Sequence, residues 1–247
     1  QLGANTAAPG TGVWTTTSTA TITDVLDPAT TISGLTAGTF DFVWTITNNT
    51  CSSSDTVTIT VSQQVNPAYA GIDQQVCASA TGLTLNADTV AIGSGLWTTT
   101  GGATITDAND PATGISNLDA GVNTFIWTVT NGACSSSDTV VVITTPNPVA
   151  NAGTDQFTTS GTPVTIGGTP ASTSGTGSAT YLWTPPTYLN DSSLANPTAT
   201  VNATQQFVLV ATDSIGCTGT DTMVVFVNNP PDVVTDSLTI NEDSTVI

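Results

Sequence analysis

One stretch of this chain occurs twice with almost no change, and this repetition constrains the fold more than any other feature. The stretch runs from Trp97 to Asp138, and its counterpart begins at Trp14. Trp14 and Trp97 are 83 residues apart, as are Cys51 and Cys134, so the two copies align without a gap. Self-similarity at this period predicts a tandem array of small modules rather than one large domain.

Prolines mark the boundaries between the predicted repeats. Pro67 opens a second repeat, Pro148 a third and Pro230 a fourth. Proline ends the hydrogen bonding of a strand and stiffens a short connection, so we expect domains at 1–65, 66–147 and 148–230, with a further module starting at 231–247. Gln1 aligns with Thr84, and residues 1–65 are therefore expected to form a repeat without its opening strand.

Short segments that alternate apolar residues with Thr or Ser follow one another along the second repeat. Such alternation, with β-branched residues and with Gly, Asn, Asp and Pro between segments, is typical of strands. A tight hairpin turn is expected at Asn131 and Gly132. The pattern predicts an all-β chain of tandem immunoglobulin-like antiparallel β-sandwiches in an extended array. The seven segments are Gln74–Ser79, Gly82–Ala87, Gly95–Thr100, Ala103–Asp107, Ala112–Leu118, Asn123–Asn131 and Ser136–Thr144.

The charge composition excludes several functions. The chain contains no Lys, Arg or His but 18 acidic residues, which gives a net charge of −18. Nucleic acids and anionic membrane surfaces are bound through cations, so neither is expected as a partner. No apolar run approaches the roughly 20 residues that span a bilayer, so membrane insertion is not expected either.

Catalysis is not expected from these residues. Without His or Lys, a general base near neutral pH would have to be a carboxylate with a raised pKa. Asp107 and Asp110 are close enough to pair, but the first repeat carries Asp24 and Asp27 at the same positions. A pair that recurs with the repeat is more simply a turn device, and the chain is predicted not to be an enzyme.

Four cysteines indicate a disulfide framework and an oxidising compartment. In the third repeat Thr159 stands where Cys77 stands in the second, so Cys217 lacks a partner within its own repeat. The sequence therefore predicts a Cys77–Cys134 bridge. Cys51 and Cys217 are left as unpaired or inter-chain cysteines, and the partner of Cys51 stays open between a strand of its own repeat and another chain.

Two kinds of binding site remain open. Asp107, Asn109 and Asp110 supply hard oxygen ligands at short spacing, and Asp73 and Asp155 follow the junctions, so structural calcium is an alternative to simple Asx-turns; no other cofactor is expected. The five tryptophans recur at repeat positions, which favours burial between the sheets over an exposed face that stacks on sugars.

Several motifs resemble those of a known class of repeat. AGIDQQVC, TITDANDPAT and TNGACSSSDTV of the second repeat, with YLWTPPTYLNDSSLANPTAT of the third, resemble PKD-like and Ig-like repeats of very long cell-surface, gliding-adhesin-type proteins of Bacteroidota. The final DSLTINEDSTVI resembles the start of a cadherin-like repeat. The resemblance implies a segment of a secreted stalk, adhesin or filament, exported by the type IX route.

The same resemblance implies O-glycosylation at Asp-Thr/Ser-apolar triplets, although such a triplet is also an ordinary strand entry. The partners it implies are neighbouring repeats of one long chain and identical chains in a filament. A carbohydrate-binding array that recognises glycans is the alternative function. The matching acceptor residues are Thr56, Thr89, Thr139, Ser214, Thr222 and Ser237.

Overall fold

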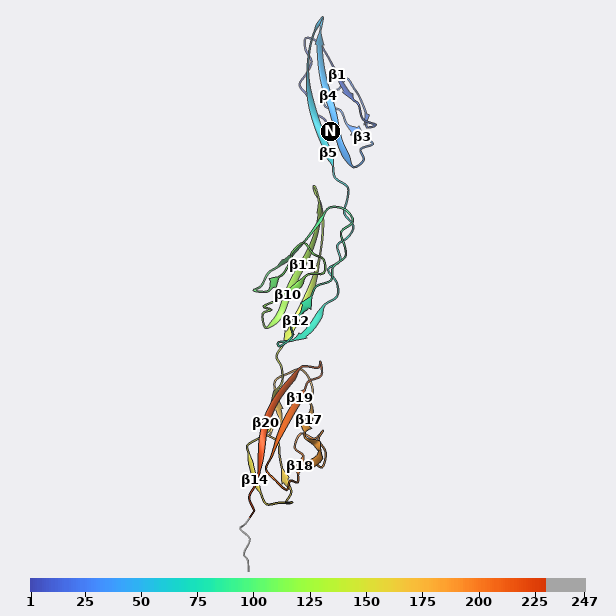
Figure 1. Cartoon of the computed structure of the whole chain (residues 1–247). Coiled ribbons are helices and arrows are strands. Elements are labelled where there is room, and N and C mark those ends of the chain that lie inside the picture. The colour runs from blue at the N-terminus through green and yellow to red at the C-terminus, as the bar shows by residue number, and fades with distance from the viewer. Residues whose placement is uncertain (230–247) are drawn as a thin grey trace, which may run out of the picture. The chain divides into compact units, whose positions relative to one another are not determined.

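The computed structural model describes residues 1–229 of the 247-residue chain as β-strands joined by turns and loops (Figure 1). Within that range the helical structure is a single short 3-10 turn, η1 (Pro186–Tyr188), and no helix is long and apolar enough to cross a membrane. The module predicted at 231–247 and the acceptor residue Ser237 lie outside the described residues. By its contacts the chain divides into two units. The first holds Gln1–Gln74 and Thr81–Ile143, and the second holds Gln75–Ala80 and the residues from Thr144 onward.

The first repeat forms two antiparallel sheets in the first unit. One sheet has the order β1-β4-β5, and the other pairs β2 with β3. Their apolar faces pack around a core that includes Leu2, Phe40 and Phe42. The strands are β1 (Thr11–Thr16), β2 (Thr21–Ile22), β3 (Ile32–Ser33), β4 (Gly38–Asn48) and β5 (Cys51–Val61).

The second repeat has a sheet of order β6-β12-β11-β8 and a sheet of order β7-β10-β9. Each of its seven strands falls on one of the seven segments that the sequence predicts, which confirms the strand assignment. The hairpin turn lies at Gly132 and Ala133, one residue later than expected, and Gly132 has the positive φ of 58° that such a turn requires. The strands are β6 (Gln74–Cys77), β7 (Leu83–Thr84), β8 (Ser94–Thr99), β9 (Thr104–Ile105), β10 (Gly114–Ser116), β11 (Gly121–Asn131) and β12 (Cys134–Thr145).

The third repeat lies in the second unit. Its main sheet has the order β14-β20-β19-β17, and the pairs β13-β16 and β15-β18 complete the sandwich. Trp183, Phe207 and Met223 are buried at its centre. The strands are β13 (Val149–Ala150), β14 (Gln156–Thr158), β15 (Val164–Thr165), β16 (Ser172–Thr173), β17 (Thr180–Thr184), β18 (Thr198–Ala199), β19 (Gln205–Thr212) and β20 (Thr218–Val227).

Residues 1–229 are therefore all-β and form tandem β-sandwiches, as the sequence predicts. Each described sheet draws its strands from one predicted repeat. One feature departs from a purely antiparallel sandwich. In the third repeat β14, which is equivalent to the opening strand β6 of the second repeat, runs parallel to the last strand β20, with Gln156 opposite Val225 and Thr158 opposite Val227.

Tryptophans form the centre of each core, as the repeat pattern predicts. Trp14 lies directly opposite Trp44, and Trp97 directly opposite Trp127. The ring centroids are 5.2 Å apart in the first pair and 5.1 Å in the second, and all four side chains are at most 4% exposed. Trp183 is also fully buried, so none of the five tryptophans forms a sugar-stacking face.

Glycine makes room for each tryptophan pair. Gly12 and Gly95 occupy equivalent positions two residues before Trp14 and Trp97. A Cβ added at Gly12 would overlap the ring of Trp44, and one added at Gly95 would overlap that of Trp127. The sequence G-x-W is therefore a packing requirement of these two cores.

Replacing Gly12 by Ala tests this requirement. We expect Gly12→Ala to lower the free energy of unfolding of the first repeat by about 1–3 kcal/mol, because the added methyl group overpacks a closed core. Denaturant unfolding followed by tryptophan fluorescence measures the change. Gly3→Ala is the control, since a Cβ at Gly3 meets no atom within 4 Å. Equal stability of the two variants would contradict the packing role of Gly12.

Candidate functional site

The opening strand of a repeat is fixed to the last strand by an aspartate carboxylate. In the second repeat the Ala70 N–H donates to Asp138 Oδ2 over 2.8 Å. In the third repeat the Ala152 N–H donates to Asp221 Oδ2 over the same 2.8 Å. Both alanines are almost completely buried, with exposed fractions of 1% and 0%. The carboxylates therefore anchor the start of each opening strand.

A second aspartate, just before the opening strand, also holds this strand against the last strand. Asp73 Oδ1 accepts the N–H of Val141 over 2.9 Å, and Asp155 Oδ1 accepts that of Val224 over 2.8 Å. Further along, the Ala78 N–H donates to Thr145 O over 2.8 Å. The contacts advance in the same direction along both segments, so the opening strand runs parallel to the last strand in the second repeat as well.

This parallel direction rules out the predicted Cys77–Cys134 bridge. Cys77 ends β6 beside Thr145, at the end of β12, whereas Cys134 is the first residue of β12. A strand rises about 3.3 Å per residue, so the 12 residues of β12 place the two cysteines roughly 35 Å apart. Bridged cysteines have Cα atoms within about 7 Å. The prediction is wrong because alignment of the repeats shows which cysteines recur but not where a strand ends.

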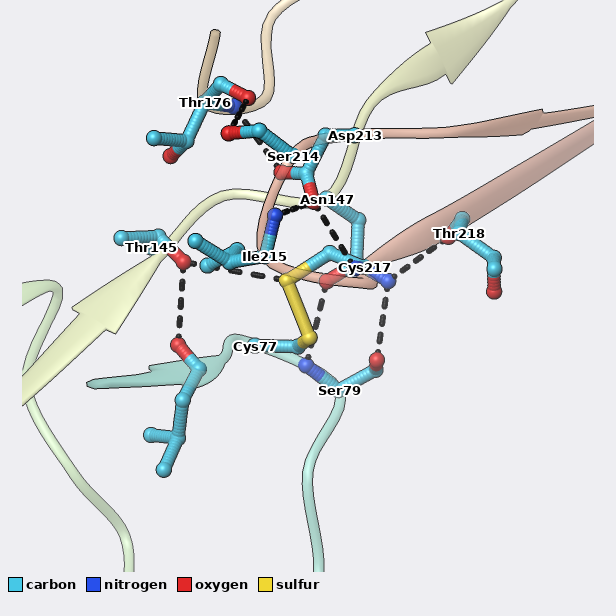
Figure 2. Close-up of a disulfide and its surroundings, with 11 residues drawn as sticks. Cys77, Ser79, Thr145, Asn147, Thr176, Asp213, Ser214, Ile215, Cys217 and Thr218 are labelled. Carbon is cyan, nitrogen blue, oxygen red and sulfur yellow. Dashed lines mark hydrogen bonds between the residues drawn. A yellow bond between two sulfur atoms is a disulfide. The ribbon is translucent and has the colours of Figure 1, made fainter. Parts of the chain in front are cut away.

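Cys77 instead forms a disulfide with Cys217, shown in Figure 2. Their Cα atoms are 5.4 Å apart, and the bond spans 140 residues of sequence. Both cysteines belong to the second unit by their contacts. The expectation that Cys217 is unpaired is therefore also wrong. Cys51 and Cys134 are free; Cys51 is exposed and Cys134 is half-buried.

Hydrogen bonds from the end of β12 and from the segment that follows it surround the disulfide (Figure 2). The Thr145 hydroxyl donates to Val76 O over 3.0 Å and lies 3.8 Å from Cys217 Sγ. Asn147 accepts the Ser79 N–H at Oδ1 and donates from Nδ2 to both Ser79 Oγ and Thr218 O. One amide side chain therefore connects the residues that flank both cysteines.

The turn that carries Cys217 is organised by a buried carboxylate. Asp213 is 7% exposed, and its Oδ1 accepts the Cys217 N–H over 2.8 Å. Burial acts to raise the pKa of the Asp213 carboxyl, but hydrogen bonds from backbone N–H groups outweigh it and hold that pKa below its usual range. The donors are the N–H groups of Thr176, Cys217, Ile215 and Gly216. The charged form of Asp213 therefore holds the turn in place.

Sequence reasoning missed the roles of Asp138, Asp221, Asn147 and Asp213. Asp138 and Asp221 recur with the repeat, but the pattern of a recurring Asp is the same for a strand anchor and for a simple turn. Asn147 reads as part of a proline-rich connection. Only its contacts with Ser79 and Thr218 reveal that it belongs to the site.

The predicted calcium ligands do not come together. Asp107 Oδ1 accepts the Asn109 N–H, and Asp110 Oδ1 accepts the Ala112 N–H, each over 2.9 Å, which are Asx-turn contacts. Asp73 and Asp155 anchor different strands, as described above. In residues 1–229 no group of three or more Cys, Asp, Glu or His side chains is arranged to hold a metal ion. The geometry thus favours the Asx-turn interpretation.

The predicted glycosylation residues within the described range are all exposed: Thr56, Thr89, Thr139, Ser214 and Thr222. Ser214 also donates its hydroxyl to Thr176 O over 2.7 Å. Asp138 and Asp221 precede Thr139 and Thr222, so strand anchoring gives these two triplets a structural reason to recur. Modification at these positions stays a prediction.

Comparison with known proteins adds a likeness of fold. No protein-family model matches the chain, and no curated protein matches it. Among solved structures, an I-band fragment from titin is 13% identical, with a TM-score of 0.46 over 90% of this chain and 89% of that one. Extracellular domains 3–5 of Drosophila OTK are 13% identical, with a TM-score of 0.37 over 78% of this chain and 72% of that one.

The ectodomain of human desmocollin-1 is 12% identical, with a TM-score of 0.29 over 90% of this chain and 55% of that one. By their names, these neighbours are an I-band fragment, a set of extracellular domains and an ectodomain. At such low sequence identities and TM-scores, these similarities carry no argument about function.

The pKa of Asp213 predicts how the stability of the second unit depends on pH. A carboxyl whose pKa is lowered by folding stabilises the folded state above its unfolded pKa of about 4, and this contribution is lost as the pH falls through the lower folded pKa. We therefore expect Asp213→Asn to destabilise the unit more at pH 7 than at about pH 2.5. Denaturant unfolding at the two pH values measures this. An equal effect at both values would show that the charge of Asp213 does not matter.

Proposed function

We propose that this chain is a non-enzymatic structural segment of an extracellular stalk, adhesin or filament, in which disulfides carry tension past the folded repeats. The observation that supports the proposal is the Cys77–Cys217 bond. A disulfide of this kind persists in an oxidising environment, which agrees with an extracellular location. Export by the type IX route, neighbouring repeats of a longer chain and identical chains as partners belong to the same proposal.

The mechanism follows from where the bond lies in the sequence. A force applied along the chain reaches Cys77 and passes through the two sulfur atoms to Cys217. The residues between them then bear no tension, although they include β7 to β12 and most of the third repeat. Unfolding of these strands cannot lengthen the chain while the bond is intact. The segment therefore keeps its length under loads that would extend a chain without the bond.

The composition suits this role. With no Lys, Arg or His, the side chains cannot form salt bridges with one another, so the fold does not depend on ion pairs that salt would screen. The repeats are held instead by buried tryptophans, backbone hydrogen bonds and the disulfide. A chain with these features also has no site for proteases that cleave after Lys or Arg, which favours persistence outside the cell.

Single-molecule stretching between the two ends of the chain tests the mechanism. The bond locks 140 residues, and at about 3.4 Å per residue these residues account for about 480 Å of contour length. We expect this length to be absent when the oxidised chain is fully extended and to appear after a reductant is added. The control is Cys51→Ser with Cys134→Ser, which should behave like the unaltered chain.

Two results would contradict the proposal. One is a full extension that does not change on reduction, since the bond would then bear no tension. The other is a hidden length of about 190 Å, the value expected for a bridge from Cys77 to Cys134. Electron microscopy of the native material then distinguishes a filament from separate particles.

A further inference from the structure

The last strand of the first repeat has an open edge. In the second and third repeats β12 and β20 lie between two strands, with the opening strand on the outer side. In the first repeat β5 is the edge of its sheet among the described residues, where it pairs only with β4. Val140 and Val142 of β12 are 1% and 0% exposed, whereas their equivalents Val57 and Ile59 are only half-buried. An edge of this kind can pair with a further strand.

The anchoring carboxylate of the opening strand is also present in the first repeat. Asp55 is equivalent to Asp138 and Asp221 in the repeat alignment. Its Oδ1 accepts the Thr56 N–H over 2.9 Å, as Asp221 Oδ1 accepts the Thr222 N–H over 2.8 Å. Its Oδ2 corresponds to the atom that receives the buried alanine N–H in the other repeats.

A cavity lies beside this carboxylate. It is lined by Trp14, Trp44, Asp55 and Val57, together with the segment 3–5. In the second and third repeats a buried alanine, Ala70 or Ala152, sits against the equivalent aspartate. The cavity is therefore placed to receive a small side chain at the start of an opening strand.

A free cysteine lies where such a strand would end. Cys134 and Cys217 occupy equivalent positions, as do Ser62 and Thr145. The Cys134 thiol is 3.8 Å from Ser62 O, and the sulfur of Cys217 is 3.8 Å from the Thr145 hydroxyl. Ala133 N–H also donates to the Ser62 hydroxyl over 3.3 Å. Cys134 and Cys217 thus lie beside equivalent residues of the preceding repeat.

From these features we infer that β5 and Cys134 form a docking site for an extended segment with the pattern of Ala70–Cys77. The segment pairs parallel to β5, places a small residue in the cavity beside Asp55, and closes a disulfide with Cys134. Ala70 and Cys77 are as far apart in sequence as Asp138 and Thr145, or as Asp55 and Ser62. A segment anchored at Asp55 therefore brings its cysteine level with Ser62, next to Cys134.

The occupant is a segment outside the described residues that carries a free cysteine, rather than a second copy of the described residues. The opening strands of this chain, β6 and β14, already pair with β12 and β20. The cysteine of β6 is in a disulfide, and Thr159, directly after β14, stands at the equivalent position. Two copies, each with a charge of −18, also repel one another.

The covalent step is a thiol–disulfide exchange. The Cys134 thiolate attacks the sulfur of an incoming cysteine that is held as a mixed disulfide with glutathione. A new sulfur–sulfur bond forms, the bond to glutathione breaks, and glutathione leaves as its thiolate. No net oxidation takes place, because the mixed disulfide supplies the oxidised sulfur.

The test uses a synthetic peptide with the sequence of residues 66–80 of this chain, its cysteine carried as the glutathione mixed disulfide. The peptide is added to the full chain with the Cys77–Cys217 bond intact. We expect an adduct on Cys134 that forms roughly tenfold or more faster than with a scrambled peptide, because docking raises the effective concentration of the cysteine. Proteolysis and mass spectrometry locate the adduct, and hydrogen exchange should slow along β5.

Three controls make the outcome decisive. Cys134→Ser should lose the covalent adduct but keep the slowed exchange along β5 when the peptide is in excess. Asp55→Ala should weaken both, and a peptide with Val in place of the alanine equivalent to Ala70 should react more slowly, because the equivalent alanines Ala70 and Ala152 are completely buried against their aspartates.

The inference is overturned by equal reaction of Cys51 and Cys134, by equal reaction of the scrambled peptide, or by an adduct without any change along β5. It is also overturned if the chain alone dimerises through Cys134, since the occupant would then be a second copy. None of these results depends on whether the chain acts as a stalk.

Discussion

The parallel attachment of each opening strand to the last strand of its own repeat is the constraint on which the junction depends. The carboxylates of Asp138 and Asp221 fix where this attachment begins. Because the two strands run in the same direction, a cysteine at the end of the opening strand lies at the exit of its repeat. It can then reach the hairpin of the next repeat in sequence but not the hairpin of its own. The parallel direction of the opening strand therefore determines which cysteines can form a disulfide.

Much of the fold could be predicted from the sequence. Alternation of apolar residues with Thr and Ser located all seven strands of the second repeat, and the recurrence of Trp14 and Trp97 indicated that they are buried. Both signals are local or periodic, and both reflect a requirement of the core. Gly12 and Gly95 give a periodic signal of the same kind. Each stands two residues before a tryptophan, because only glycine leaves room there for the ring of the paired tryptophan.

The disulfide could not be predicted in the same way. Aligning the repeats treats each one as self-contained. It therefore predicted a disulfide between Cys77 and Cys134 and left Cys217 without a partner. The direction of β6 relative to β12 decides the question, and sequence alternation is the same for parallel and antiparallel strands. The roles of Asn147 and Asp213 were hidden for a related reason, since each contacts a backbone group that is distant in sequence, Thr218 O and Thr176 N respectively. A polar side chain in a loop does not show from the sequence alone which backbone groups it will hydrogen-bond in the fold.

The account rests on the pairing of Cys77 with Cys217, and mapping the disulfide of the native, unreduced chain tests it most directly. The chain has no Lys or Arg for trypsin-like proteases, so a protease that cleaves beside aspartate is used instead. The account predicts one linked pair of peptides that contains Cys77 and Cys217, with Cys134 free to react with an alkylating reagent. A linked pair that contains Cys77 and Cys134 would contradict it, because the opening strand could not then run parallel to β12.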